Sequence, residues 1–383
     1  MSSRYFDNAA TTRVKGEVLN KMLPFFDNQF GNPSSMYTLG RSARRALEDA
    51  RKNVANLINA NSNEIILLGG GSEADNTVLK GIAHRYREKG NHIITSKIEH
   101  PAILNSCKSL EQEGFEITYL NVDNDGIVDI QELRNSINSK TILISIMFAN
   151  NEIGTIQPIE QISKIAKEND IIFHTDAVQA CGNIPIDVKK LGIDLLSLSG
   201  HKLYGPKGTG ALYIKDGIEI SNLIDGGHQE KGKRAGTENV AGFVGLGEAC
   251  KISNENINTH YKYLKKLRDY YISQIEQNII DVKLNGNREE RLPGNANFSF
   301  KNVDGEALLL KLDELGISAS SGSACSTGNP NPSHVLTAIG LDEKDAKSAL
   351  RVTFGEDNEI GDVDYLVRAI IKIVDELRKD IDK

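Results

Sequence analysis

The sequence has 383 residues, of which 39% are hydrophobic and 25% charged, with 34 glycines and 9 prolines, and this composition excludes collagen-like, low-complexity and wholly disordered proteins. The 45 basic and 52 acidic side chains give a formal net charge of −7, which excludes the strong basic field that a nucleic acid or an anionic membrane requires. At about 150 residues per domain, the length predicts two to three domains.

Helix and strand patterns alternate through roughly the first 240 residues. Apolar residues at helical spacing predict one helix from Leu39 to Ile58 and another from Asn76 to Tyr86. Short apolar runs predict strands at Glu64–Leu68, His92–Ser96, Ile117–Leu120, Thr141–Met147, Ile171–Thr175 and Leu195–Leu198. Because repeated strand–helix units build a largely parallel sheet covered by helices on both faces, the sequence predicts an α/β fold.

The pattern changes near residue 238. A long helical stretch to about Gln277 is followed by a strand at Ala296–Phe300, a helix at Glu306–Leu315 and a final pair of helices. We interpret this part as a second, smaller α+β domain, and residues 1–15 would join it because they have no place in the alternating pattern. The predicted domains are therefore residues 16–260, and residues 1–15 together with 261–383.

The four cysteines, Cys107, Cys181, Cys250 and Cys325, lie far apart and form no Cys-x-x-Cys pair, which argues against a disulfide framework and a zinc ribbon. No apolar run approaches the ~20 residues of a membrane span, and no long apolar segment opens the chain. We therefore expect a cytoplasmic protein without membrane contact. Cys325 lies in a polar loop from Ser320 to Pro332, where thiol chemistry is a better explanation than core packing.

Candidate site residues follow the predicted strands, because ligands of open α/β sheets bind at the carboxyl ends of strands. Gly69, Gly70 and Gly71 follow a strand and lead into a helix, whose first N–H groups can bind phosphate. The segment to Ala74 also fits the dinucleotide fingerprint G-x-G-x-x-A. No acidic residue ends the next strand where a ribose contact requires one, and a tight strand–helix turn would need the same glycines.

Asp176 and Lys202 also follow strands. A buried Asp176 needs a cationic partner, unless it simply caps a helix. Lys202, in a Gly/Pro-rich loop, is a candidate Schiff-base former if it is partly desolvated, and otherwise an ordinary loop lysine. His100 and the turn Asn150–Gly154 occupy equivalent positions, although a lone histidine is more often structural and Asn-rich turns are common for backbone reasons.

Taken together, these residues match the needs of pyridoxal phosphate. Its aldehyde bonds to a lysine, its ring nitrogen pairs with an acid, and its phosphate needs N–H and hydroxyl donors. Lys202 is the lysine, Asp176 is the acid, and the glycine turn provides donors for the phosphate. His100 is a candidate for stacking on the ring.

Ten motifs occur in one order along the chain: Tyr5–Thr12, Gly31–Ser35, Gly71–Asn76, Glu99–His100, Asn150–Gly154, His174–Gln179, Ser199–Lys202, Arg234–Asn239, Ser320–Cys325 and Leu350–Thr353. In this order they resemble the NifS/IscS-type cysteine desulfurases of the class V aminotransferase group, nearly end to end. The resemblance implies an α/β fold of the pyridoxal-phosphate-dependent aminotransferase type (fold type I). It also implies a large domain with a mainly parallel seven-stranded sheet, and a smaller α+β C-terminal domain that carries the active-site cysteine loop.

The resemblance implies that L-cysteine is converted to L-alanine while its sulfur passes to Cys325 as a persulfide. Lys202 would carry the cofactor and remove the Cα proton, and His100 would stack on the ring and shuttle a proton. The other expected contacts are Asp176 to the pyridine nitrogen, Asn151 and Gln179 to the ring oxygen, Gly71, Ser72, Ser199 and His201 to the phosphate, Thr237 to the phosphate of the other subunit, and Asn32 and Arg351 to the substrate carboxylate.

The same resemblance implies a homodimer that passes sulfur to an acceptor protein, such as an iron–sulfur scaffold or another thio-cofactor or thio-nucleotide enzyme. No resident metal is expected, and Cys325 is a candidate transient iron–sulfur ligand. The loop Ser326–Pro332 departs from the family in lacking the hydrophobic residue that members often place before its acidic or polar residue and Pro. Its length nevertheless resembles the long-loop branch.

Three other functions stay open. A class V aminotransferase or a selenocysteine lyase would use the same cofactor residues, but would leave the Cys325 loop without a role. An NAD-dependent dehydrogenase would explain the G-x-G-x-x-A match, and would show a nicotinamide requirement. A non-catalytic sulfur-protein scaffold would not need Lys202, Asp176 and Cys325 together.

Overall fold

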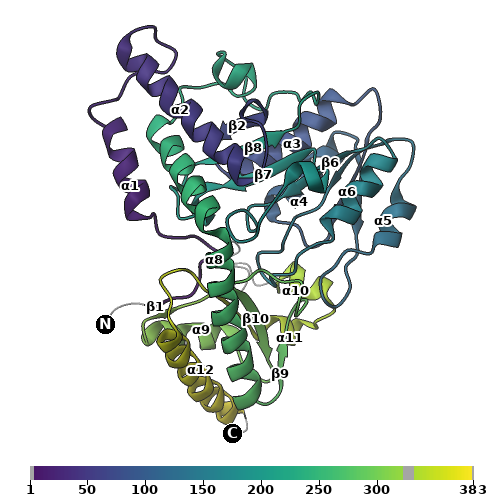
Figure 1. The fold of residues 1–383 in the computed structure, drawn as a ribbon. Helices are drawn as coiled ribbons and strands as arrows, with labels where there is room; N and C mark the ends of the chain where they lie inside the picture. Colours follow the sequence, from purple (N-terminus) through teal and green to yellow (C-terminus); the bar gives the residue numbers. More distant parts are fainter. Residues whose placement is uncertain (1–3, 322–331, 382–383) are drawn as a thin grey trace.

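A seven-stranded sheet lies at the centre of the larger part of the computed structural model, which describes residues 4–321 and 332–381 (Figure 1). Its strand order is β2-β8-β7-β6-β5-β3-β4. The strands are β2 (Ile65–Leu68), β3 (His92–Ser96), β4 (Glu116–Leu120), β5 (Thr141–Ser145), β6 (Ile172–Asp176), β7 (Leu195–Ser199) and β8 (Gly210–Ile214). Only β8 within this sheet runs antiparallel to its neighbours, β2 and β7. The α/β prediction is therefore confirmed.

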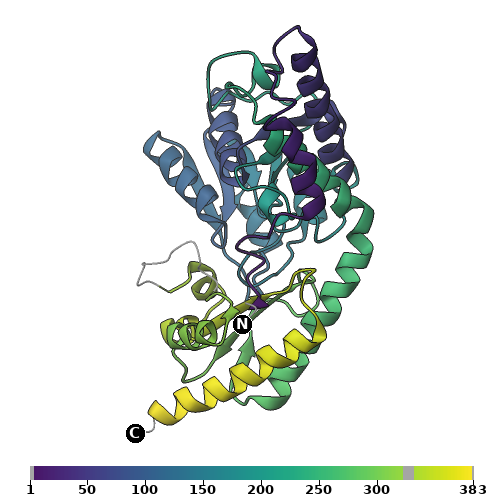
Figure 2. The ribbon, with the colours of Figure 1, turned by 90° about the vertical axis from the view of Figure 1, so that its left-hand side faces the viewer.

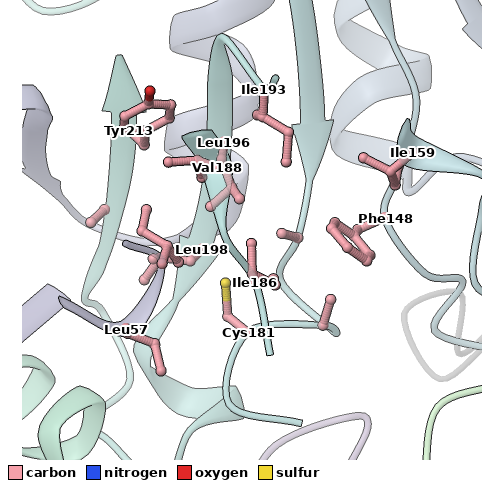
Figure 3. Close-up of a cluster of buried hydrophobic side chains, with 14 of the residues drawn as sticks. Leu57, Phe148, Ile159, Cys181, Ile186, Val188, Ile193, Leu196, Leu198 and Tyr213 are labelled. Carbon is pink, nitrogen blue, oxygen red and sulfur yellow. The ribbon is translucent and has the colours of Figure 1, made fainter. Parts of the chain in front are cut away.

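Helices cover both faces of this sheet. They are α1 (Gly16–Met22), α2 (Thr38–Leu57), α3 (Gly71–Arg85), α4 (Pro101–Gln112), α5 (Ile130–Ser136), α6 (Ile159–Glu168) and α7 (Val188–Leu191). Successive side chains of a strand point to opposite faces, so Leu195 of β7 belongs to an apolar cluster with residues of α3 and α4, whereas Leu196 belongs to a cluster with residues of α2 and α6. Figure 3 shows part of the cluster that contains Leu196, in which Leu198 and Cys181 also lie among other buried apolar side chains.

The long helix α8 (Val240–Asn278) runs from the large sheet down to a second, three-stranded antiparallel sheet (Figures 1 and 2). This sheet has the order β12-β10-β9, with β9 (Val282–Leu284), β10 (Asn295–Phe300) and β12 (Ala349–Thr353). The helices α9 (Gly305–Glu314) and α12 (Ile360–Ile381) pack beside it and share one apolar cluster with the end of α8.

The N-terminal segment packs with the C-terminal part of the chain. Strand β1 (Arg4–Tyr5) pairs in parallel with β11 (Ile317–Ser318). The next residue, Phe6, is fully buried, and its ring centroid lies 5.8 Å from that of Phe354 in an edge-on contact. These contacts carry the following residues, Ala9 to Thr12, to the loop that holds Lys202.

Two parts of the secondary-structure prediction are wrong. Strand β8 was not predicted. Its short apolar run comes directly after the Gly/Pro-rich loop, with no long helix between β7 and β8. The expected final pair of helices is instead α10 (His334–Ala338), α11 (Glu343–Lys347), strand β12 and α12. The polar Arg351 interrupts the apolar pattern of β12, although every residue of this strand is buried. No helix in the described part of the chain is both long and apolar enough to cross a membrane.

Candidate active site

A cavity of about 660 Å³ opens where the carboxyl ends of the central strands meet the starts of α3 and α4. Its volume is in the range of small-molecule and cofactor sites. Its walls come from both sheets, because Arg351 of β12 faces residues that follow β5, β6 and β7. The residues predicted from the sequence that line this cavity are Gly71, Ser72, His100, Asn151, Asp176, Gln179, Ser199, His201, Lys202 and Arg351.

Two predicted site residues do not reach the cavity, and a third lies outside the described part of the chain. Asn32 and Thr237 are exposed and do not line it, and the Asn32 side chain accepts a hydrogen bond from the N–H of Ser34 at 2.9 Å. Cys325 lies outside the described residues. Conversely, the cavity is also lined by Asp75, Glu99, Glu152, Ser333 and His334, to which the sequence analysis gave no role. Asp75 and Glu99 lie within two of the motifs quoted above. Their place in these motifs was the sequence signal that could have identified them as site residues.

Lys202 ends a short 3₁₀ turn, η3 (Gly200–Lys202), that follows β7. Its ammonium donates to the carbonyls of Ala9 and Ala10, with an Nζ–O distance of 2.7 Å to Ala10. Gln179 donates to the same Ala9 carbonyl at 3.0 Å. The N-terminal segment thus holds the lysine at the cavity wall by carbonyl oxygens.

His100, which follows β3, and Asp176, at the end of β6, approach the cavity from two strands that β5 separates. The N–H of Ala102 donates to His100 Nδ1 at 3.1 Å, so the neutral ring carries its proton on Nε2. Burial lowers the pKa of His100; the carboxylate of Asp176 opposes this, and the charge of Lys202 adds to it. Burial raises the pKa of Asp176, and His100, the N–H of Val178 at 2.9 Å and Lys202 act in the opposite direction. Asp176 is therefore the carboxyl of the site on which the positive charge of Lys202 acts.

The start of α3 forms a cradle that leaves no room for a side chain at residue 71. A Cβ atom on Gly71 would lie 2.6 Å from Cγ2 of Val178, and Gly70 adopts a φ of 153°. Beside this cradle opens a second cavity of about 510 Å³, lined by Ser72, Ser199, His201 and Lys207 among others. Helix N–H groups, hydroxyls and a lysine together suit a phosphate group.

Arg351 is almost fully buried on β12. Its Nη2 lies 2.7 Å from the Asp7 carboxylate, and its Nη1 donates to the carbonyl of Asn151 at 3.0 Å. Asn297 of β10 donates to the next carbonyl, that of Glu152, at 3.2 Å. These contacts tie the Asn151 turn, which follows β5, to the second sheet, and they orient a planar cation suited to bind a carboxylate.

In the described chain, no group of three or more His, Cys, Asp and Glu side chains could hold a metal ion. The three cysteines of the described chain, Cys107, Cys181 and Cys250, are buried free thiols. Burial raises the pKa of Cys107 and that of Cys250 to about 12, which keeps both thiols protonated and unreactive.

Comparison with known proteins gives a consistent result. The family described as aminotransferase class-V matches residues 4–366. A protein named cysteine desulfurase IscS from Clostridium botulinum is 53% identical over 377 residues, which is 98% of this chain and 95% of the relative. A relative of the same name from Methanosarcina thermophila is 53% identical over 374 residues, covering 98% of this chain and 92% of the relative.

Solved structures agree with these relatives. One titled NifS-like protein has a TM-score of 0.92 at 38% identity, covering 97% of this chain and 99% of the other. Another, titled SspA in complex with cysteine, has a TM-score of 0.82 at 38% identity, with coverages of 92% and 99%.

Proposed function

The chain belongs to the aminotransferase class-V family, and from this premise we propose that it is a cysteine desulfurase, which converts L-cysteine to L-alanine and transfers the sulfur to Cys325. The observation that carries the proposal is one cavity that holds Lys202, Asp176, His100 and Arg351 together. The relatives that share about half of its residues are named for the same reaction.

The cavity fits pyridoxal phosphate. Lys202 provides the amine for its aldehyde, Asp176 the acid for its ring nitrogen, and the start of α3 a cradle that a Cβ would fill. When bound, this cofactor supplies an electron sink that weakens the Cα–H bond of an amino acid. Asn151 and Gln179 line the same cavity and are the proposed contacts of the ring oxygen.

The chain's own groups then carry out binding and proton transfer. Arg351 would hold the substrate carboxylate, for which its planar donors are suited. The neutral amine of Lys202 would remove the Cα proton, and His100 would deliver a proton from Nε2. In the overall step the Cβ–S bond of cysteine breaks and an S–S bond to Cys325 forms. Alanine leaves with hydrogen in place of sulfur, so no external oxidant or reductant is needed.

A homodimer is the proposed assembly. Large apolar side chains are exposed in one stretch of α1, the following loop and the start of α2: Leu19, Leu23, Phe26, Phe30, Met36, Tyr37 and Leu39. Exposed apolar surface of this extent marks an interaction site. In such a dimer Thr237 would reach the phosphate in the partner's cavity, and Asn32 would contact substrate only if the partner subunit brings it to a cavity.

Two further assignments belong to this proposal. Residues 16–260 would form the cofactor-binding domain and residues 1–15 with 261–383 the small domain, with a boundary inside the continuous helix α8. The persulfide of Cys325 would pass to a cytoplasmic acceptor protein, such as an iron–sulfur scaffold, with Cys325 as a transient ligand.

The decisive experiment measures alanine and sulfide formed from L-cysteine by the purified enzyme with pyridoxal phosphate and a thiol reductant. We expect equal amounts of both products from the wild type and none from Lys202→Ala. Cys325→Ser should still bind the cofactor, with its visible absorbance intact, but should form neither product. Undiminished turnover by Cys325→Ser would contradict its role as sulfur acceptor, and a requirement for a keto acid would indicate an aminotransferase.

A further inference from the structure

Four buried carboxyls line the cavity, and three of them influence one another. Asp75 of α3, Glu99 just before α4 and Asp176 at the end of β6 are 1%, 0% and 6% exposed. We call them the carboxyl triad. Three buried anions in one site would repel each other and lose their hydration, which the folded protein tolerates only with matching cations.

Glu99 has hydrogen-bond donors on one of its two oxygens only. Oε1 accepts from the hydroxyl of Ser96 at 2.7 Å and from the N–H of Met147 at 2.9 Å. Oε2 is buried and has no hydrogen-bond partner. An ionised carboxylate leaves such an oxygen with an unsatisfied negative charge, whereas a neutral acid places its proton there.

Asp75 has no counter-charge either. Its Oδ1 lacks a hydrogen-bond partner and lies 3.9 Å from Nε2 of His174. That imidazole is engaged by Ser145 on one nitrogen and by Ser197 on the other, at 2.9 and 3.0 Å. Burial lowers the pKa of His174 to about 3, so it is neutral and does not form an ion pair with Asp75.

The remaining groups around the triad favour one charge on Asp176. The charges of His100 and Lys202 lower the pKa of Asp176. Glu99 faces Asp176 and the protonated thiol of Cys107, and its own carbonyl accepts from His334. Burial, with Asp176 as the nearby like charge, raises the pKa of Asp75 well above its usual range and that of Glu99 to about 8.

We propose that Asp75 and Glu99 are neutral carboxylic acids in the folded protein, and that they are positioning residues which leave the negative charge of the carboxyl triad on Asp176. The protonation of Asp75 and Glu99 does not depend on which reaction the enzyme performs. The further claim, that the charge on Asp176 serves to bind a cofactor's ring nitrogen, rests on the proposed function.

The first test reads the protonation state directly. Infrared spectra of the cofactor-free protein at pH 6.5 should contain the C=O stretch of protonated carboxyls. Asp75→Asn and Glu99→Gln should each remove one component of this band, whereas Asp176→Asn should leave both. If neither isosteric variant changes the protonated-carboxyl band, the proposal is wrong, whatever reaction the enzyme performs.

The second test uses matched pairs of variants and the affinity of the cofactor-free protein for pyridoxal phosphate. Asn and Gln imitate a neutral acid, whereas Leu at 75 and Met at 99 keep the bulk and remove the polar group. We expect Kd within about twofold of wild type for Asp75→Asn and Glu99→Gln, and about tenfold weaker binding for Asp75→Leu and Glu99→Met. Equal losses in both members of a pair would show that a charged carboxylate is required, and would overturn the proposal.

Discussion

Burial acts in opposite directions on the acids and the bases of the cavity. It raises the pKa of Glu99 to about 8 and lowers that of His201 to about 4. Both shifts favour the neutral form, because a charged group loses its hydration inside the protein. Glu99 and His201 therefore add little charge to the cavity wall near neutral pH, and a bound anion or cation meets fewer charged partners there.

The shift at Glu99 predicts a specific dependence of stability on pH. The unfolded chain releases this proton near pH 4.5, and the folded chain only near pH 8. Between these values the folded state binds more protons, so its stabilisation, fully present below pH 4.5, decreases by about 1.4 kcal/mol per pH unit as the pH rises. Urea unfolding at pH 5, 6, 7 and 8 should show a shallower decline for Glu99→Gln than for wild type.

A surface acid provides the control for this measurement. The N–H of Lys190 and the side chain of Asn59 bond to Asp187 and lower its pKa. Its stabilisation is lost only as the pH falls into the acid range, so Asp187→Asn should be offset from wild type by a constant amount between pH 5 and 8. Parallel curves for wild type and Glu99→Gln would show that Glu99 is already ionised in the folded state.

Arg351 supports a second prediction at the residue scale. Arg351→Lys keeps the positive charge but loses the planar pair of donors, so the substrate carboxylate would be held by one point charge. We expect KM for L-cysteine to increase by about tenfold or more, with a smaller change in kcat. Arg13→Lys is the matched control, because Arg13 pairs with Asp357 on the surface. A lower kcat at unchanged KM would assign Arg351 to another step.

At the scale of single elements, the start of α3 depends on the absence of a side chain at Gly71. In Gly71→Ala the new Cβ would lie 2.6 Å from Val178 Cγ2, and it would displace either that side chain or the first turn of the helix. We expect about tenfold weaker binding of pyridoxal phosphate and a loss of stability of about 1–3 kcal/mol. Gly361→Ala in α12 meets no atom within 4 Å, so it should not affect binding.

The elements also explain which parts of the architecture could be predicted from sequence. Strand β3 is a short, largely apolar run and helix α2 carries an uninterrupted pattern of period 3.6, and the structure places both within a residue of their predicted ends. Strand β12 could not be predicted, because its central Arg351 is a buried cation whose contacts include Asp7 and Asn151, which lie far away in the sequence. The proposed neutral state of Asp75 and Glu99 likewise depends on their burial in the folded chain. No local sequence pattern predicts that burial.

At the scale of the whole molecule, the cavity joins segments that the sequence separates widely. The Ala9–Ala10 carbonyls hold Lys202, and Asp7 holds Arg351, so residues at the start of the chain contact both halves of the cavity. Lys15 and Glu356 add an ion pair of 2.6 Å between the two parts. The site is therefore complete only when the N-terminal segment is docked, which gives that segment a direct function in binding.

The proposed homodimer can be tested by mixing two inactive or weakened subunits. In a heterodimer of Lys202→Ala and Thr237→Ala chains, one cavity would contain both defects if Thr237 serves the partner's phosphate. The other cavity would contain neither, and would recover about half of the wild-type alanine production per dimer, because one of two equivalent sites is intact. Differently tagged subunits purified as the mixed dimer, and assayed against both homodimers, provide the measurement. If Thr237 instead serves its own chain, each cavity keeps one defect, and the mixed dimer would be no more active than the average of the two homodimers.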